Sequence, residues 1–240
     1  MQKKIAFLLC IIILVFNNKL ALAQSTEKYM EVSIENKQIQ EETECVRANL
    51  SIPIIKIKDN NQLEAKISEK INNDILTWRS DLTDLAYKYK EDYSKDNITF
   101  REFELITKYE LTYNKNNLLS IPITYYQYTG GAHGLNTKIS YNINLDSGSA
   151  IQLKELFKDG SEYQIKVNEY IKEEILKHPE EYFNNGEDFK GIKDKQDFYI
   201  DNDGIVVYFQ VYEIAPYVSG VREFKIPFSL IESDLKFKLN

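Results

Sequence analysis

The sequence predicts an α+β fold: mostly antiparallel sheets with two main helices. Two observations carry this prediction. In two separate stretches apolar residues recur every three or four positions, as on the buried face of an amphipathic helix. In the segments around and between them apolar and polar residues alternate, which is typical of half-buried strands. The expected order is strand, helix, strand-rich segment, helix, strand-rich segment, and two helices over mostly antiparallel strands give an α+β architecture.

The first 23 residues have the pattern of a signal peptide. Lys3 and Lys4 precede the short apolar run 5–16, and Ala21-Leu22-Ala23 has the small-x-small pattern of a cleavage site. The run is short for a transmembrane helix. We expect a secreted chain with no transmembrane segment after cleavage, and an uncleaved N-terminal anchor is the alternative.

The charge balance is acidic. The chain carries a formal net charge of −7, and removal of the leader with its three lysines lowers this to −10. A nucleic-acid surface needs clustered Lys and Arg, so this class of partner is not expected. A basic partner would suit the charge. Only Cys45 remains after cleavage, which excludes a disulfide within one chain. A buried thiol is favoured, with a reactive or intermolecular one as the alternative.

Residues 24–150 are expected to form an N-terminal lobe that ends in a glycine-rich hairpin. Residues 24–41 read as an edge strand or a loose arm, and 46–57 as a long strand in which Pro53 implies an edge position or a bulge. A helix follows Asn60-Asn61. Its apolar face is formed by Leu63, Ile67, Ile71, Ile75 and Trp78.

This helix is expected to be capped by a pair resembling a capping box, Asn61 with Glu64. It should end near Tyr89, with the charged run 88–96 as a solvated helix end and loop. Further strands are expected at 97–113, 118–128 and 137–145. The last of these is expected to have one apolar, buried face and one polar, solvent-exposed face. The turn between the first two is expected at 114–117.

Residues 151–240 are expected to form a second α+β lobe. Its helix carries the inner stripe Val167, Ile171 and Ile175, with Asp159 or Ser161 as the cap and Pro179 as the stop. The remaining elements are a short strand at 198–200, a hairpin at Asp203-Gly204, a central strand at 205–212, a loop at 213–220 and a final strand at 224–228.

Catalytic, metal and cofactor sites are not expected. His133 and His178 lie far apart in the sequence, and neither belongs to a metal-binding pattern such as HExxH. Residues 201–204 resemble part of a calcium loop, but Tyr199 and Gln210 occupy its first and last ligand positions, so a hairpin turn is favoured. Serine-nucleophile motifs are missing. Paired carboxylates for glycoside hydrolysis cannot be selected from 37 acidic residues.

The stretch Tyr125–Gly134 stands out, with three glycines and a histidine between two predicted strands. The glycines are expected to adopt positive φ in a wide hairpin, with His133 as a hydrogen-bonding loop residue. A ligand or partner surface is the alternative. Tyr126 and Tyr128 flank this loop, and Tyr212 and Tyr217 flank the second loop; tyrosine is enriched in binding surfaces.

Two segments resemble the signatures of one bacterial extracytoplasmic domain family. The first is 126–134, followed by an alternating strand, Asp146-Ser147-Gly148 and Leu153-Lys154-Glu155-Leu156-Phe157. The second is Phe209–Gly220, which contains Tyr212-Glu213-Ile214-Ala215-Pro216-Tyr217. The family of unknown function is found in the lysozyme-sensing anti-sigma-V factor (RsiV-like) and beside some peptidoglycan deacetylases. The resemblance covers about residues 43–235.

The resemblance implies a secreted or cell-surface, non-enzymatic binding module of the bacterial cell envelope. Its partner would be lysozyme or another basic protein, or peptidoglycan. The alternative is an enzyme that acts on cell-wall polysaccharide through unidentified carboxylates. The expected binding residues belong to the two signatures: Tyr126, Tyr128, Gly130, Gly131, His133, Tyr212, Pro216 and Tyr217.

Overall fold

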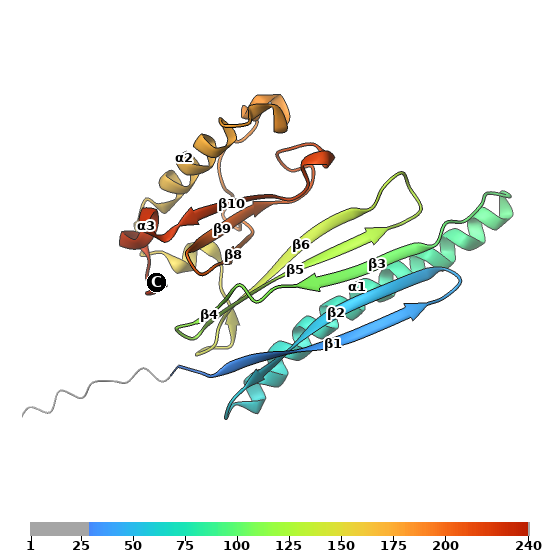
Figure 1. Cartoon of the computed structure of the whole chain (residues 1–240), viewed down its shortest axis with the longest axis horizontal. Coiled ribbons are helices and arrows are strands. Elements are labelled where there is room, and N and C mark those ends of the chain that lie inside the picture. Colours follow the sequence, from blue (N-terminus) through green and yellow to red (C-terminus); the bar gives the residue numbers. More distant parts are fainter. Residues whose placement is uncertain (1–28, 240) are drawn as a thin grey trace, which may run out of the picture.

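The computed structural model describes residues 29–239 (Figure 1). The predicted signal peptide and its alternative, an uncleaved anchor, lie outside the described residues. Within 29–239, none of the helices combines the length and the apolar character that crossing a membrane requires.

Two sheets confirm the predicted α+β class, with mostly antiparallel pairing. The strands of the larger sheet are β1 (Val32–Glu42), β2 (Val46–Ile57), β3 (Phe103–Tyr109), β5 (Leu118–Tyr128), β6 (Leu135–Asn144) and β7 (Ser149–Ala150), in that spatial order, with β4 (Tyr113–Lys115) paired to β5. The smaller sheet has the order β10 (Arg222–Pro227), β9 (Gly204–Phe209), β8 (Phe198–Ile200).

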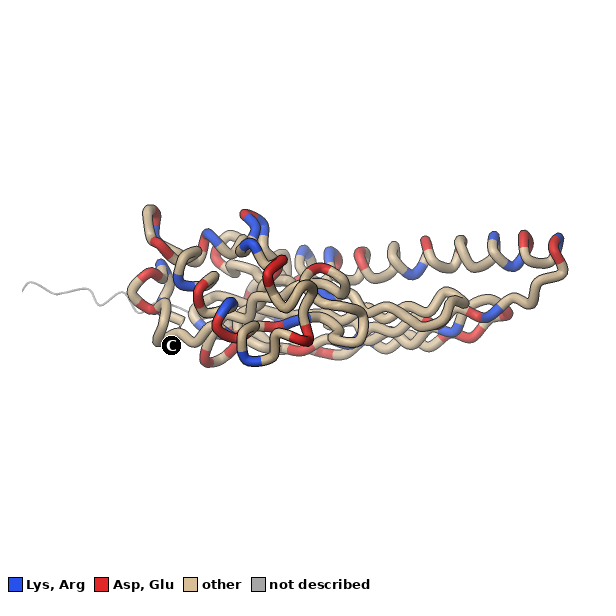
Figure 2. Tube along the Cα trace, turned by 90° about the horizontal axis from the view of Figure 1, so that it is seen from above, with Lys and Arg blue, Asp and Glu red and all other residues tan. Residues whose placement is uncertain are grey.

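The long helix α1 (Asn61–Lys95) covers one face of the larger sheet and leaves the other face open (Figures 1 and 2). Its cap is Asn60, whose side chain accepts a hydrogen bond from the Leu63 amide at 3.1 Å. The predicted pair of Asn61 and Glu64 is therefore wrong. The Glu64 carboxylate instead accepts from the Ile57 amide at 3.1 Å, because the preceding strand runs directly beside the first turn.

α1 also continues to Lys95, beyond the predicted end at Tyr89. Aromatic contacts accompany the added turns: Tyr93 lies against Tyr89 and against Phe100, with ring centroids 5.9 and 6.4 Å apart. Residues 88–95 are thus helical rather than a loop. The expected strand 97–113 is correspondingly shorter, because the chain first leaves this helix end and pairs only as β3 and then β4.

The sheet contains one parallel pair, β2 with β3, which the sequence analysis did not predict. α1 is the crossover that such a pair requires. Pro53 lies in β2, which is not an edge strand, but the pairing with β3 stops at Leu50. At Pro53, β2 is therefore paired with β1 alone. On the other side no strand needs a hydrogen bond from the N–H group that proline lacks. β1 is an edge strand, so within the described part of 24–41 the chain forms the expected edge strand rather than a loose arm; residues 24–28 lie outside the described residues.

The smaller sheet packs on part of the face of β5 and β6 that lies opposite α1, and the rest of that face stays open. The prediction that one face of 137–145 is solvent-exposed is therefore wrong where the two sheets meet, because Asn142 on that face is only 5% exposed. Its amide donates to the Phe198 carbonyl oxygen at 2.7 Å and accepts from the Ser120 hydroxyl at 2.6 Å. The same hydroxyl accepts from the Ile200 amide at 2.9 Å.

The smaller sheet is covered by α2 (Tyr163–Ile175) and the short α3 (Phe228–Ile231). Neither Asp159 nor Ser161 caps α2; the cap position is Glu162, without a side-chain bond. Asp159 instead pairs with Lys236 at 2.9 Å. Short 3-10 turns occur at Leu153–Leu156, Pro179–Glu181, Phe183–Gly186, Tyr217–Ser219 and Glu232–Asp234.

Two differences concern the last strands. β9 is the central strand of its sheet, as predicted, but it ends at Phe209 because Gln210 leaves the ladder. Tyr212 adopts a positive φ of 71° in the loop that follows. Phe228 opens α3 instead of closing the final strand.

Two hydrophobic clusters form the core. One lies between α1 and the larger sheet and includes Cys45, which is fully buried as predicted. The other joins the smaller sheet to α2 and α3, and it also takes in Tyr113 and Leu118 from the larger sheet. A division into lobes near residue 150 stays a prediction. Lys and Arg positions are interspersed with Asp and Glu positions along α1 (Figure 2).

Candidate functional site

The two signature segments meet in the structure. The His133 ring stacks on the Tyr217 ring with centroids 3.8 Å apart and planes 24° apart. The Tyr217 hydroxyl donates a hydrogen bond to the Gly134 carbonyl oxygen at 2.7 Å. We call this contact of His133 and Gly134 with Tyr217 the signature junction. Figure 1 shows the loop after β9 reaching toward the tip of the β5–β6 hairpin.

Tyr126 packs against Gly134 of this junction. A Cβ atom added to Gly134 would lie 2.4 Å from the Tyr126 ring, so the ring occupies the space that a side chain at 134 would need. Gly134 is buried there. The glycine is required for close approach rather than for a left-handed backbone.

The other two glycines of the loop differ from one another. Gly130 has a φ of 85°, as predicted. Gly131 is not among the residues with positive φ, and a Cβ there would meet open space, so the prediction of positive φ is wrong for Gly131 and Gly134. The loop is held from within: the Tyr128 hydroxyl donates to the Gly131 carbonyl oxygen at 3.1 Å, and Arg101 lies within 3.4 Å of both groups.

The second loop presents its side chains outward. Pro216 precedes the 3-10 turn Tyr217–Ser219, which Gly220 ends with a φ of 66°. Tyr212 is 54% exposed and its ring centroid lies 5.9 Å from that of Tyr217. Val218 is 89% exposed. The structure thus brings His133, Tyr126, Tyr212 and Tyr217 together, whereas Tyr128, Gly130, Gly131 and Pro216 shape the two loops.

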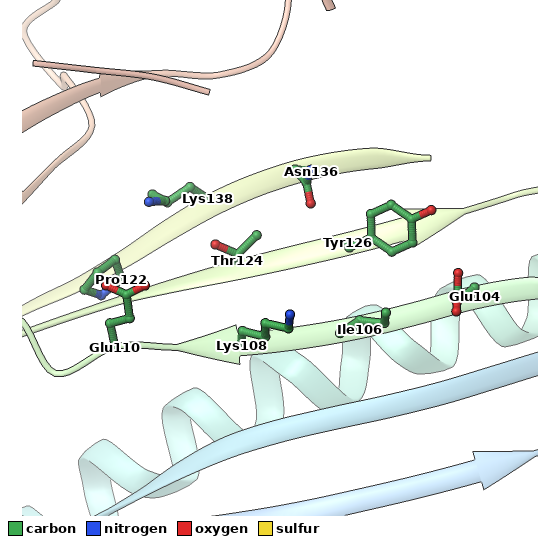
Figure 3. Close-up of a pocket in the computed structure, with 9 residues that line it drawn as sticks. All are labelled: Glu104, Ile106, Lys108, Glu110, Pro122, Thr124, Tyr126, Asn136 and Lys138. Carbon is green, nitrogen blue, oxygen red and sulfur yellow. The ribbon is translucent and has the colours of Figure 1, made fainter. Parts of the chain in front are cut away.

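A groove of about 420 Å³ lies beside the junction, on the open face of β3, β5 and β6. Figure 3 shows the lining side chains: Glu104, Ile106, Lys108, Glu110, Pro122, Thr124, Tyr126, Asn136 and Lys138. Sequence reasoning identified only Tyr126 among them. The available signal was the period of two along residues 104–110, which places their polar side chains on the face opposite the core.

One wall of the groove is tied to the smaller sheet. The Gln210 carboxamide accepts from the Lys138 amide at 3.1 Å and donates to the Lys138 carbonyl oxygen at 2.7 Å, as a neighbouring strand would. The Lys138 ammonium pairs with Glu223 and lies 5.3 Å from the centre of the Tyr199 ring. Burial and the Glu223 carboxylate, which accepts from the Tyr199 hydroxyl at 2.8 Å, raise the pKa of Tyr199. Lys138 is therefore held in place.

Ser219, in the 3-10 turn beside the junction, does not form a hydrogen bond with His133, as a nucleophilic serine and its base would. The Ser219 hydroxyl donates to the Glu181 carbonyl oxygen at 2.9 Å, and the His133 Nδ1 atom lies 3.1 Å from the Gly134 carbonyl oxygen. Among residues 29–239, no three His, Cys, Asp or Glu side chains converge in a way that could hold a metal ion.

Family models match two parts of the chain. Residues 39–136 match the model described as deacetylase PdaC, and residues 154–229 match the protein of unknown function DUF3298. The first signature thus begins in one match, and the second signature lies in the other.

Two curated relatives come from Bacillus subtilis. The peptidoglycan-N-acetylmuramic acid deacetylase PdaC is 26% identical over 62% of this chain, and the chain spans only 32% of its length. The anti-sigma-V factor RsiV is 25% identical over 82% of this chain and 68% of its own length.

Solved structures show the same fold. A DUF3298 family member from Bacteroides fragilis superposes with a TM-score of 0.63 at 21% identity, over 87% of this chain and 94% of that one. A DUF3298 family protein from Pseudomonas aeruginosa gives 0.57 at 15% identity, over 88% and 96%. The family models confirm the resemblance identified from the two signatures: residues 39–136 match the PdaC model, and residues 154–229 match the DUF3298 model.

Proposed function

We propose that this chain is a non-enzymatic, extracytoplasmic binding module that recognises a basic protein, with lysozyme as the partner that the family resemblance implies. The observation that carries the proposal is the signature junction. It joins two loops from distant parts of the sequence and presents Tyr212 and Val218 to solvent beside it. Exposed aromatic side chains held on a rigid support are typical of the anchors of protein interfaces.

Two further properties support the proposal. The similarity to RsiV and to a DUF3298 domain supports an RsiV-like extracellular domain, in agreement with the predicted signal peptide. The net charge of −7, or −10 without the leader, favours encounter with a basic protein through long-range attraction.

The alternative is an enzyme that cleaves or modifies cell-wall polysaccharide through paired carboxylates. Such pairs lie about 5–9.5 Å apart in glycoside hydrolases. The groove offers Glu104 and Glu110, which are six residues apart on one side of the same strand and its extension. At about 3.4 Å per residue this separates their backbones by about 20 Å, so the two do not form such a pair. This separation argues against a hydrolytic pair of carboxylates in the groove.

Calorimetric titration of the purified protein with lysozyme tests the proposal. We expect a dissociation constant of micromolar or below, weakened at least about tenfold in the double variant Tyr212→Ala, Val218→Ala. Tyr87→Ala is the matched control, because Tyr87 is 44% exposed on α1, away from the junction. Lack of binding at micromolar concentration would contradict the lysozyme proposal. Release of soluble fragments from peptidoglycan by the pure protein would contradict the non-enzymatic one.

A further inference from the structure

We propose that this protein forms a symmetric dimer in which the edge strands β1 of two copies pair antiparallel and join the two larger sheets. The open edge of β1, the direction of its main-chain groups and the order of its charges support this dimer. None of the residues of the signature junction lies in β1, so the dimer is independent of the protein-binding role proposed above.

β1 is a long edge strand that lacks a proline and a bulge, two features that usually prevent pairing with another chain. Its eleven residues pair with β2 in one continuous register. Figure 1 shows β1 along one border of the larger sheet. Natural proteins shorten, bend, charge or cover such borders, because unpaired N–H and C=O groups bind a further strand. The edge of β1 is therefore suited to strand addition.

Side chains cover the neighbouring edge positions and leave a defined segment of β1 open. At the start of the strand, the Met30 amide donates to the side chain of Asn117 at 2.7 Å. The Val32 carbonyl oxygen accepts from the side chain of Asn114 at 3.0 Å. On β6, at the other side of the sheet, the Gln210 carboxamide covers main-chain groups in the same way. The open segment of β1 therefore begins after Val32.

The even-numbered residues of β1 direct their main-chain groups outward. The Glu31 carbonyl oxygen accepts from the Lys58 amide at 3.1 Å, beside the start of the strand. The Thr43 amide donates to the Val46 carbonyl oxygen at 2.9 Å, beside its end. Odd-numbered residues thus bond to β2, and the alternation along a strand turns the even-numbered ones outward. Within residues 29–239, no hydrogen bond reaches the outward main-chain groups of 34–42.

The charges of β1 favour one register for a second copy. With Asn36 of the two copies opposite each other, Glu35 of each lies opposite Lys37 of the other. Opposite charges directly across a strand pair attract, and like charges repel. Shifting the centre by one residue places the two copies of Glu35, or the two copies of Lys37, opposite each other. The register centred on Asn36 also pairs residues 33–39 of both copies, beyond the covered start of β1.

The contacts of the charged side chains agree with this register. Lys37 is exposed and donates to the side chain of Asn72 at 2.9 Å. Its ammonium has three donors, so it can bind Glu35 of the other copy as well. Another register would place Lys37 opposite Glu41, but the Arg79 guanidinium already pairs with Glu41. A strand pair of this length buries a small area, so we expect a weak dimer.

Sedimentation velocity of the purified protein tests the dimer. We expect the mass to rise from that of one chain at about 1 µM toward twice that value at about 500 µM. Lys37→Glu and Glu35→Lys each place like charges opposite each other and should weaken dimerisation at least about tenfold. The variant with both changes exchanges the charges and should dimerise like the wild type. Lys88→Glu, exposed on α1, changes the net charge as Lys37→Glu does and should leave dimerisation unchanged.

Disulfide trapping tests the register. Asn36→Cys places two thiols opposite each other with Cα atoms about 5.5 Å apart, which a disulfide can span. Gln40 is exposed on the same edge, but its two copies would lie about 27 Å apart. Mild oxidation should therefore link Asn36→Cys into a covalent dimer and leave Gln40→Cys unlinked. The native Cys45 is fully buried and does not compete.

Three results would overturn the inference: a constant mass of one chain up to about 500 µM, equal weakening in the single and combined charge variants, or equal disulfide formation at the two cysteine positions. The first result would leave the β1 edge to an unrelated extended chain. The double variant Tyr212→Ala, Val218→Ala separates the dimer from the proposed function. It should dimerise like the wild type while losing lysozyme, so failure of either proposal leaves the other standing.

Discussion

The Tyr217 hydroxyl donates a hydrogen bond to the Gly134 carbonyl oxygen at 2.7 Å, across 83 residues of sequence. The ring of the same tyrosine stacks on His133. One side chain of the smaller sheet's long loop thus holds the tip of the β5–β6 hairpin by two different contacts.

Tyr217→Phe keeps the stacked ring and removes the hydrogen bond. We expect the free energy of unfolding to fall by about 1 kcal/mol, the usual net contribution of one such bond. Denaturant unfolding followed by circular dichroism measures the change. Tyr87→Phe on α1 is the control and should differ from the wild type by less than about 0.5 kcal/mol. An unchanged stability of Tyr217→Phe would show that the bond does not hold the loops together in solution.

Gly134→Ala and Gly131→Ala form a matched pair within one loop. The new Cβ at 134 would lie 2.4 Å from the Tyr126 ring, whereas the one at 131 meets open space. Overpacking of this kind costs about 1–3 kcal/mol, so Gly134→Ala should unfold at a clearly lower temperature. Gly131→Ala should stay close to the wild type. Thermal unfolding decides the matter, and equal midpoints for the two variants would contradict the assigned role of Gly134.

Asn142→Leu removes a buried amide that bridges the two sheets. The Phe198 carbonyl oxygen would lose the donor of its side-chain hydrogen bond, and the Ser120 hydroxyl would lose its acceptor, at a buried position. Each unsatisfied buried group costs about 1–3 kcal/mol, so we expect a loss of about 3 kcal/mol in unfolding free energy. Asn136→Leu, which is exposed on the same face of the same strand, should cost less than about 0.5 kcal/mol. Similar losses in both variants would argue against a bridging role for Asn142.

Asp197→Asn should raise the stability at neutral pH. Burial raises the pKa of the Asp197 carboxyl, although a hydrogen bond of 3.1 Å from Gln210 acts in the opposite direction. A folded-state pKa above the unfolded value means that the charged form disfavours folding, and that this penalty disappears as pH falls through the folded pKa. The asparagine carries no such penalty and can still accept from Gln210.

The gain in melting temperature of Asp197→Asn should therefore be largest near neutrality and shrink toward the unfolded-state pKa of about 3.9. Melting temperatures recorded from neutral to acidic pH measure it, with Asp188→Asn as an exposed control. If the gain in melting temperature grew as the pH fell, folding would lower the pKa of Asp197 instead of raising it, and the prediction would be wrong.

Local patterns predicted much of the fold. The apolar spacing from Leu63 to Trp78 indicated α1, the run 118–128 coincides with β5, and Asp203-Gly204 forms the expected hairpin between β8 and β9. Each of these follows from side chains that are close together in the chain. Their periodicity reflects which face is buried, whatever lies on the other side.

Several predictions that proved wrong depend on contacts between different elements of the structure. Glu64 bonds to the preceding strand instead of closing a capping box, and Asn142 is covered by β8 instead of by water. The parallel pairing of β2 with β3 depends on the path of α1 between them. None of these contacts leaves a trace in the local pattern.

The sequence by itself determined the two signature segments, the acidic charge and the alternation that separates the faces of each strand. Tertiary structure alone decided that His133 meets Tyr217, and that side chains of three strands line one groove around Tyr126. The physical reason is that alternation states only which residues share a face. The order and register of the strands, set by packing of the whole chain, decide which of those residues become neighbours.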